Sequence, residues 1–171
     1  MLYSSLKNKS AKMILMYIVG YLFSTLLKSS LCIFPFRSFL LRLLGSKIDK
    51  GSRLYEISFW NFYKNGFKNL RIGEKVFIGP ETMIDLADKV TIGTNSTVSA
   101  RVIILTHVNV GFDDNPLKIV LPDNYSSVNI GDRVFIGVNS TIMPGVTIGN
   151  DCIIGAMSIV LKDVASGTIV A

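Results

Sequence analysis

The sequence predicts an all-β domain, wound as a coil of short strands and preceded by an α-helical hydrophobic arm. Three regularities predict the coil. An aliphatic residue recurs every six residues from Ile130 to Val160, glycine usually follows it, and a small or β-branched residue stands four positions after it. A period of six fits neither the 3.6-residue helical repeat nor simple strand alternation, so each repeat is one short strand and one corner. The repeated aliphatic positions are Ile130, Ile136, Ile142, Ile148, Ile154 and Val160.

The same pattern runs upstream from Ile72 to Ile104, where its phase changes twice. Eight residues separate Ile84 from Ile92, which inserts two extra residues at one corner. Twenty-six residues separate Ile104 from Ile130, which requires an excursion out of the coil. Turn-forming residues concentrate at about 107–127, so this segment is predicted to be a long exposed loop. Loops of that length are usually functional or disordered.

Charge divides the 171-residue chain unevenly. Residues 1–53 carry nine Lys and Arg against one Asp, which is +8, whereas the whole chain carries +6 and the remainder therefore −2. Together with 49% hydrophobic residues, this favours an N-terminal segment attracted to anionic lipid and argues against a nucleic-acid-binding surface on the coil. We therefore divide the chain into an arm (residues 1–45), a connector or cap (46–71) and the coil domain (72–171).

The arm contains fifteen uncharged residues, Met13 to Leu27. A helix of that length is about 22 Å long, short of the roughly 30 Å hydrocarbon core. We expect two helices, interrupted at Pro35, that lie on or dip into one membrane leaflet. Two alternatives stay open, a soluble cap packed on the coil and a cleaved signal peptide, although no clear cleavage site follows Leu27.

Two stretches, Ile104–His107 and Ile154–Asp163, together with the repeats and the long loop, resemble the hexapeptide-repeat acyltransferases. This family includes galactoside, maltose, streptogramin and polysaccharide O-acetyltransferases, and the resemblance covers about residues 70–171. It implies a left-handed parallel β-helix with three hexapeptides per turn. It also implies a homotrimer that binds acetyl-CoA in a cleft between neighbouring subunits.

The resemblance also implies roles for individual residues. His107, the single histidine, matches the family's general base, and an imidazole titrates in the range that such a base needs. The amide of Val138 lies in the repeat that supplies the oxyanion donor in the resembled enzymes. The cofactor-binding positions that match are Val138, Gly155, Ala156, Ser158 and Lys162. The repeat alone already explains Gly155 and Ser158, and Leu161 stands where the family often has a hydroxyl residue.

The polar candidates for contact with an acceptor are Asp85, Asp113, Asp114 and Asn115. Carboxylates and amides suit sugar hydroxyls, but each of these residues could equally be a turn former or a solvated loop residue. The family normally continues with a Gly-x-Pro-Ala segment after the position of Ala171, so we expect either a truncated chain or an incomplete cofactor site.

No metal is expected. Cys32 and Cys152 have neither metal-ligand spacing nor a disulfide partner pattern. A single histidine cannot supply the three-histidine zinc site of the hexapeptide-repeat carbonic anhydrases. The function expected is therefore acetyl transfer from acetyl-CoA to a sugar hydroxyl, in surface polysaccharide or glycolipid synthesis at the cytoplasmic side of the membrane. Two alternatives are acetylation of an antibiotic or other small molecule, and a non-catalytic β-helix scaffold at the membrane.

Overall fold

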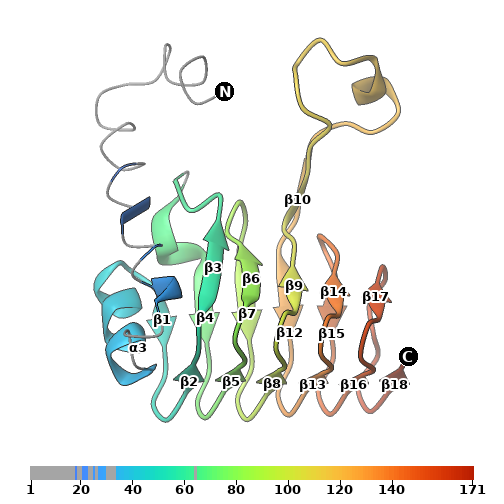
Figure 1. Ribbon diagram of the computed structural model, residues 1–171. Coiled ribbons are helices and arrows are strands. Elements are labelled where there is room, and N and C mark those ends of the chain that lie inside the picture. Colours follow the sequence, from blue (N-terminus) through green and yellow to red (C-terminus); the bar gives the residue numbers. More distant parts are fainter. Residues whose placement is uncertain (1–17, 19–20, 23–24, 26, 30–33, 64) are drawn as a thin grey trace.

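Short parallel strands wind into a β-helix in the computed structural model (Figure 1). The structure describes residues 18, 21–22, 25, 27–29, 34–63 and 65–171. Most of the predicted helix at Met13–Leu27, and Cys32, lie outside these residues. The all-β fold class predicted from the hexapeptide rhythm is confirmed.

Three parallel sheets form the flat sides of the coil, and the chain visits them in turn. Sheet A contains β1 (Lys47–Ile48), β4 (Leu70–Ile72), β7 (Val90–Ile92), β12 (Val128–Ile130) and β15 (Thr147–Ile148). Sheet B contains β2 (Arg53–Leu54), β5 (Phe77–Ile78), β8 (Thr97–Val98), β13 (Phe135–Ile136), β16 (Ile153–Ile154) and β18 (Ile169–Val170). Sheet C contains β3 (Ile57–Trp60), β6 (Thr82–Asp85), β9 (Ile103–Ile104), β14 (Thr141–Ile142) and β17 (Ile159–Val160).

The register explains the six-residue rhythm. In sheet C, Ile84 pairs with Ile104, Ile104 with Ile142, and Ile142 with Val160. All four side chains are buried, so one aliphatic residue per strand stacks on its equivalent in the next turn. This continuous interior stack is the hydrophobic core.

Glycine at the corners permits close stacking of the turns. A Cβ on Gly137 would lie 2.5 Å from the backbone nitrogen of Ala156 and 2.7 Å from its Cα. Neither atom can move without displacing the next turn of backbone. The glycine after Ile136 therefore reflects the spacing between turns.

The N-terminal end of the coil is covered by α3 (Phe34–Leu43), which packs on β1 and β2. Leu40 and Leu41 are buried against the core. The guanidinium of Arg37 is buried as well and donates to the carbonyls of Leu27, Ser29 and Leu54 at 2.8, 2.9 and 2.6 Å. It thereby fastens residues 27–29 and α3 to the first turn.

The coil begins at β1. The sequence pattern predicts a later start, at residue 72. Residues 47–60 form a complete turn that pairs with the next one, so the segment assigned as connector or cap is largely part of the coil. The helix α3 packs on this first turn. Within the described part of the chain, no helix combines the length and the apolarity needed to cross a membrane.

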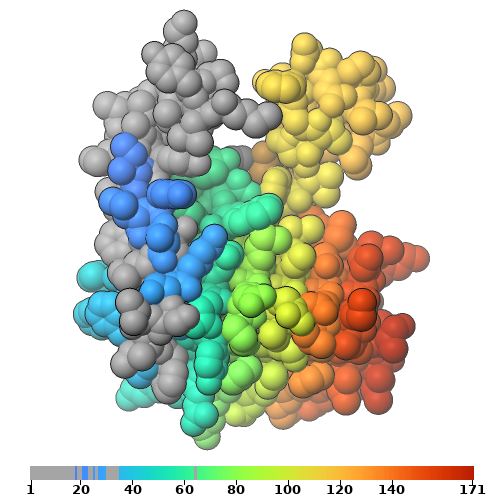
Figure 2. Space-filling view, viewed as in Figure 1, coloured from blue at the N-terminus to red at the C-terminus, as the bar shows by residue number. Residues whose placement is uncertain are grey.

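Every interruption of the repeat falls at the corner that leads from sheet C to sheet A. After β3 the chain makes the η1 turn (Gly66–Asn69), and after β6 it carries the two extra residues. After β9 it leaves the coil through the antiparallel pair β10 (His107–Val108) and β11 (Asn124–Tyr125). The loop between them, with η2 (Pro116–Ile119) at its far end, stands clear of the coil (Figures 1 and 2).

Candidate active site

The corner after sheet C brings the single histidine onto a buried carboxylate. His107 begins β10 where the loop leaves the coil, and Asp85 ends the neighbouring strand β6. His107 Nδ1 lies 2.5 Å from Asp85 Oδ2. The Asp85 side chain is 0% exposed and that of His107 is 23% exposed. We refer to this pair as the dyad.

Both carboxylate oxygens of Asp85 are fully engaged. Oδ1 accepts from Asn61 Nδ2 at 2.7 Å and from the Ala87 amide at 3.2 Å. Oδ2 accepts from the amide and the hydroxyl of Thr106, each at 2.9 Å, in addition to facing His107. Burial opposes ionisation, but the hydrogen bonds from Asn61, His107 and Thr106 outweigh it and hold the pKa of Asp85 below its usual range.

An ionised carboxylate at this distance fixes the histidine tautomer. Asp85 Oδ2 can only accept, so Nδ1 carries the hydrogen and, in the neutral ring, Nε2 has the lone pair. Asn61 Nδ2 also lies 3.4 Å from Nδ1, but two donors cannot bond each other, so we interpret this as a contact and the 2.5 Å pair as the hydrogen bond. Nε2 makes no hydrogen bond with any described residue and is the atom available as a base.

Several supporting residues are absent from the sequence-based site. Asn61 holds a left-handed backbone conformation, with φ 55°, directly after β3. Thr106 precedes the histidine, and Tyr125 stacks on the His107 ring with centroids 6.0 Å apart and planes 14° apart. Thr106 lies within the Ile104–His107 stretch and could have been considered. Asn61 and Tyr125 carry no repeat signal that would point to them.

Of the acceptor candidates, Asp85 lies at His107, whereas Asp113 and Asn115 lie in the long loop. The sequence placed Asp85 among the acceptor contacts, but its carboxylate is buried beneath the histidine. Asp113 lies in the long loop and forms an exposed ion pair with Lys118 at 2.9 Å. Asn115 caps η2 by accepting from the Leu117 amide at 3.0 Å, and its Nδ2 donates to the Val110 carbonyl at 2.7 Å. Both loop residues have local structural roles.

Four of the cofactor candidates share one corner, between sheets B and C. The Met157 amide donates to the carbonyl of Val138, and Ser158 Oγ donates to that of Gly155, both at 2.8 Å. Ala156 is exposed beside them. Lys162 lies elsewhere: continuing the register of β9, β14 and β17 by two residues aligns it with Thr106, at the corner of His107. It is exposed and forms no ion pair with a described residue.

The small exposed corner with Ala156 is compatible with a pantetheine arm, and the cation of Lys162, at the neighbouring corner, with a phosphate, so these residues fit a coenzyme A-type ligand. No cluster of three or more His, Cys, Asp or Glu side chains in the described part of the chain could hold a metal ion.

The model of the family described as bacterial transferase hexapeptide (six repeats) matches residues 127–162. The Bacillus subtilis protein YvoF, provisionally named an acetyltransferase, is 30% identical over 112 residues, which are 64% of this chain and 60% of that protein. The galactoside O-acetyltransferase of Escherichia coli is 30% identical over 118 residues, 58% of each chain. The chain thus spans about three-fifths of the length of these two relatives.

Among solved structures, a maltose O-acetyltransferase of Clostridium difficile superimposes with a TM-score of 0.76 at 27% identity, over 94% of this chain and 83% of that one. The hexapeptide-repeat acetyltransferase VCA0836 of Vibrio cholerae, solved with acetyl-coenzyme A, also gives 0.76, at 25% identity over 95% and 85% of the two chains. The likeness therefore extends over nearly all of the β-helix.

Proposed function

Because the chain belongs to the hexapeptide-repeat acyltransferase family, we propose that it transfers an acetyl group from acetyl-CoA to a sugar hydroxyl. The observation that carries this proposal is the hydrogen bond of His107 Nδ1 to the buried Asp85 carboxylate. In the neutral ring this bond leaves the lone pair on Nε2, as a general base requires. The galactoside and maltose acetyltransferases among the similar proteins support a sugar as the acceptor.

In the proposed reaction His107 Nε2 removes the proton from the acceptor hydroxyl while its oxygen attacks the thioester carbonyl carbon. The tetrahedral oxyanion forms within reach of a backbone amide, for which Val138 remains the candidate. When the C–S bond breaks, the imidazolium returns its proton to the departing thiolate. Asp85 is a positioning residue, because it touches neither substrate but orients the imidazole and stabilises its charged form, as the third member of a catalytic triad does.

The test is acetyl-CoA-dependent thiol release by the detergent-purified full chain, with glycan and glycolipid extracts as acceptors. We expect His107→Ala to lower acceptor-dependent release by about 10²–10⁴-fold, since that is the usual contribution of a general base. Lys47→Ala, on the exposed outer face of sheet A, is the control. Equal rates for wild type and His107→Ala would remove His107 as the base. An absence of both release and coenzyme A binding would favour a non-catalytic scaffold.

A trimer would complete the proposed site. Within one chain the corner with Gly155 and Ala156 lies about a hexapeptide away from that of His107, roughly 15 Å or more at 3.3 Å per residue. A neighbouring subunit could bring its own Gly155 corner beside His107. The outer faces of the sheets favour such packing. Sheet A presents polar residues, whereas the outer faces of sheets B and C also carry exposed apolar ones, including Phe135, Ile153 and Ile159, at 45, 44 and 65% exposure.

Subunit mixing tests this assembly. His107→Ala and Ala156→Trp chains should each be inactive alone, the first without a base and the second with a blocked cofactor corner. Refolded together they should regain activity, because mixed trimers contain some sites with both wild-type corners. Inactive mixtures with confirmed subunit exchange would place both corners of a site in one chain.

We also propose that the protein lies on the cytoplasmic side of the cell membrane. The outward face of α3 carries Phe36, Phe39 and Leu43 at 48, 57 and 72% exposure, with Arg42 beside them. Exposed apolar residues flanked by cations are typical of helices that lie at an anionic lipid surface. Sedimentation with vesicles should increase when anionic lipid is included and fall for Phe39→Glu. Equal sedimentation of the two proteins would contradict this role of α3.

A further inference from the structure

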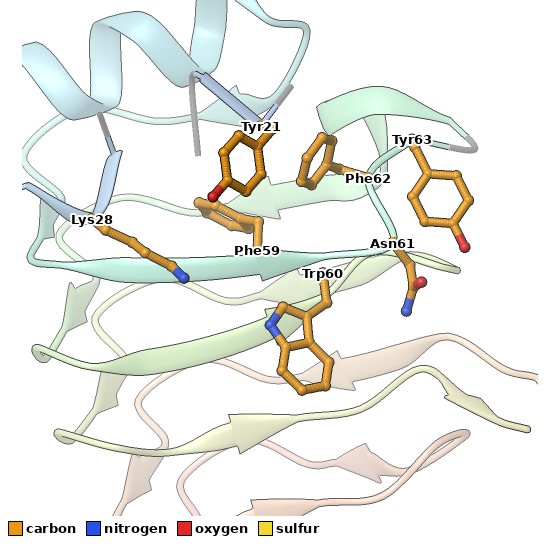
Figure 3. Close-up of a pocket in the computed structure, with 7 residues that line it drawn as sticks. All are labelled: Tyr21, Lys28, Phe59, Trp60, Asn61, Phe62 and Tyr63. Carbon is orange, nitrogen blue, oxygen red and sulfur yellow. The ribbon is translucent and has the colours of Figure 1, made fainter. Parts of the chain in front are cut away.

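An aromatic cavity adjoins the dyad. It has a volume of about 320 Å³ and is lined by Tyr21, Lys28, Phe59, Trp60, Asn61, Phe62 and Tyr63. In Figure 3 the rings of Tyr21, Phe59 and Phe62 gather on one side of strand β3, toward which the amino end of Lys28 points, and the indole of Trp60 projects from the other side of the strand. The cavity is thus an apolar hollow with a few polar groups at its margin, which is the usual composition of a small-molecule site.

Two of its residues connect the cavity to the chemistry. Trp60 pairs in register with Asp85, so the two side chains leave the sheet on the same face from adjacent strands about 4.8 Å apart. Asn61 donates to Asp85 Oδ1 and lies against His107. A molecule in this cavity would therefore lie next to the histidine that we propose as the base.

The composition favours a sugar. The faces of a sugar ring carry C–H groups that pack on aromatic side chains, and its rim carries hydroxyl groups that need polar partners. Trp60 is 50% exposed although it lies beside the buried Asp85, so it is accessible for such packing. Asn61 Oδ1 accepts no hydrogen bond from a described residue and could accept one from a sugar hydroxyl.

Lys28 adds a charge requirement. It is the charged member of the lining set, is exposed, and forms no ion pair with a described residue. An ammonium group at the rim of an apolar hollow is suited to a carboxylate or a phosphate.

On the basis of the proposed function, we propose that this cavity is the acceptor subsite, where a sugar ring packs on Trp60 beside His107 and an anionic group of the same acceptor pairs with Lys28. The acceptor is then an acidic glycan, whose charge is either a carboxylate or a phosphate. None of the residues expected from the sequence to contact the acceptor lines this cavity.

Trp60 is the single tryptophan of the chain, so its fluorescence reports on the cavity without any acetyl transfer. The full-length protein in detergent is titrated with a neutral oligosaccharide, a uronate-containing oligosaccharide and a sugar phosphate. We expect a saturable change in emission with at least one anionic sugar, and binding about 2–5-fold tighter than for the neutral one, which is the upper range for an exposed ion pair. Whichever anionic sugar binds more tightly, the uronate or the phosphate, identifies the anionic group. No change with any saccharide, or equal binding of all three, would overturn the proposal.

Variants separate this proposal from the proposed function. Trp60→Ala should raise the acceptor KM about 10-fold, a typical effect for one aromatic contact, while the KM for acetyl-CoA stays unchanged. Lys28→Ala should abolish the preference for anionic sugars and leave neutral ones unaffected. Phe112→Ala, at an 80% exposed aromatic of the loop, and Lys47→Ala are matched controls. Transfer by wild type with unaltered acceptor KM in both cavity variants would refute the subsite alone. Failure of wild type to transfer to any glycan would refute the proposed function instead.

Discussion

The same corner of the coil, from sheet C to sheet A, is built differently in the first and the last turns. In the last turns it is a plain repeat corner after β14, Met143-Pro144-Gly145, and a shortened one after β17, Leu161-Lys162-Asp163, where Ile148 aligns with Val164 instead of a residue two positions later. In the first three it is irregular and carries Asn61, Asp85 and His107, which bond to one another. The comparison indicates that the regular repeats provide a rigid frame and that departures from the repeat, stacked at one corner, provide the chemistry. Substitutions at the irregular corner should therefore mainly lower turnover, whereas substitutions in the regular repeats should mainly lower stability.

The largest effect on turnover after loss of His107 itself should come from Asp85→Asn. An amide can present its NH₂ group to Nδ1, which favours the tautomer with hydrogen on Nε2 and removes the base. We expect kcat to fall by about 10²–10⁴-fold with little change in the KM for either substrate. Asp49→Asn, at an exposed corner of the first turn, is the control. A variant that changed only KM would indicate that Asp85 acts in binding.

The largest effect on stability should come from the regular part. Ile142 is 0% exposed in the stack of sheet C, and Ile142→Ala should lower the free energy of unfolding by about 2–5 kcal/mol in chemical denaturation. Turnover per folded molecule should be retained. Ile119→Ala, at an 87% exposed loop position, should change stability by no more than about 0.5 kcal/mol. Loss of turnover in fully folded Ile142→Ala protein would contradict the division between frame and chemistry.

A smaller effect is expected in acid. The pKa of Asp85 is lowered in the folded protein, so the unfolded chain takes up the proton first as the pH falls. The contribution of this carboxylate to stability is therefore complete above about pH 5 and is lost as the pH falls below its usual value of about 3.9. Urea unfolding between about pH 5 and pH 3 should show a shallower decline for Asp85→Asn than for wild type. Parallel declines would show that Asp85 does not titrate abnormally.

The regular part of the molecule could be predicted from sequence because each of its repeats carries the same signal. The aliphatic positions from Ile136 to Val160 each mark a short strand, the corner that follows it and the side chain that points inward. The sequence predicted His107 as the base from its motif, but it did not predict Asp85 as its partner. Alignment of Ile84 with Ile104 would have placed Asp85 beside Leu105, two residues from the histidine. The dyad's partner Asn61 could not be found in this way, because its position depends on a left-handed backbone turn in a segment without repeats.

The loop shows a second limit. Asp113 and Asn115 have the residue types of a sugar site, but their partners are Lys118 and the backbone around η2. Local turn chemistry and ligand chemistry use the same polar side chains, so composition alone does not distinguish them.

The tautomer of His107 tests the central claim most directly. Because the chain contains a single histidine, ¹⁵N-histidine labelling and NMR of the full chain in detergent micelles give one unambiguous pair of ring nitrogens. At a pH where the ring is neutral, we predict hydrogen on Nδ1 and a bare Nε2 in wild type, and a shift toward hydrogen on Nε2 in Asp85→Asn. Hydrogen on Nε2 in wild type would contradict the account, because that nitrogen could then not accept a proton from an acceptor hydroxyl.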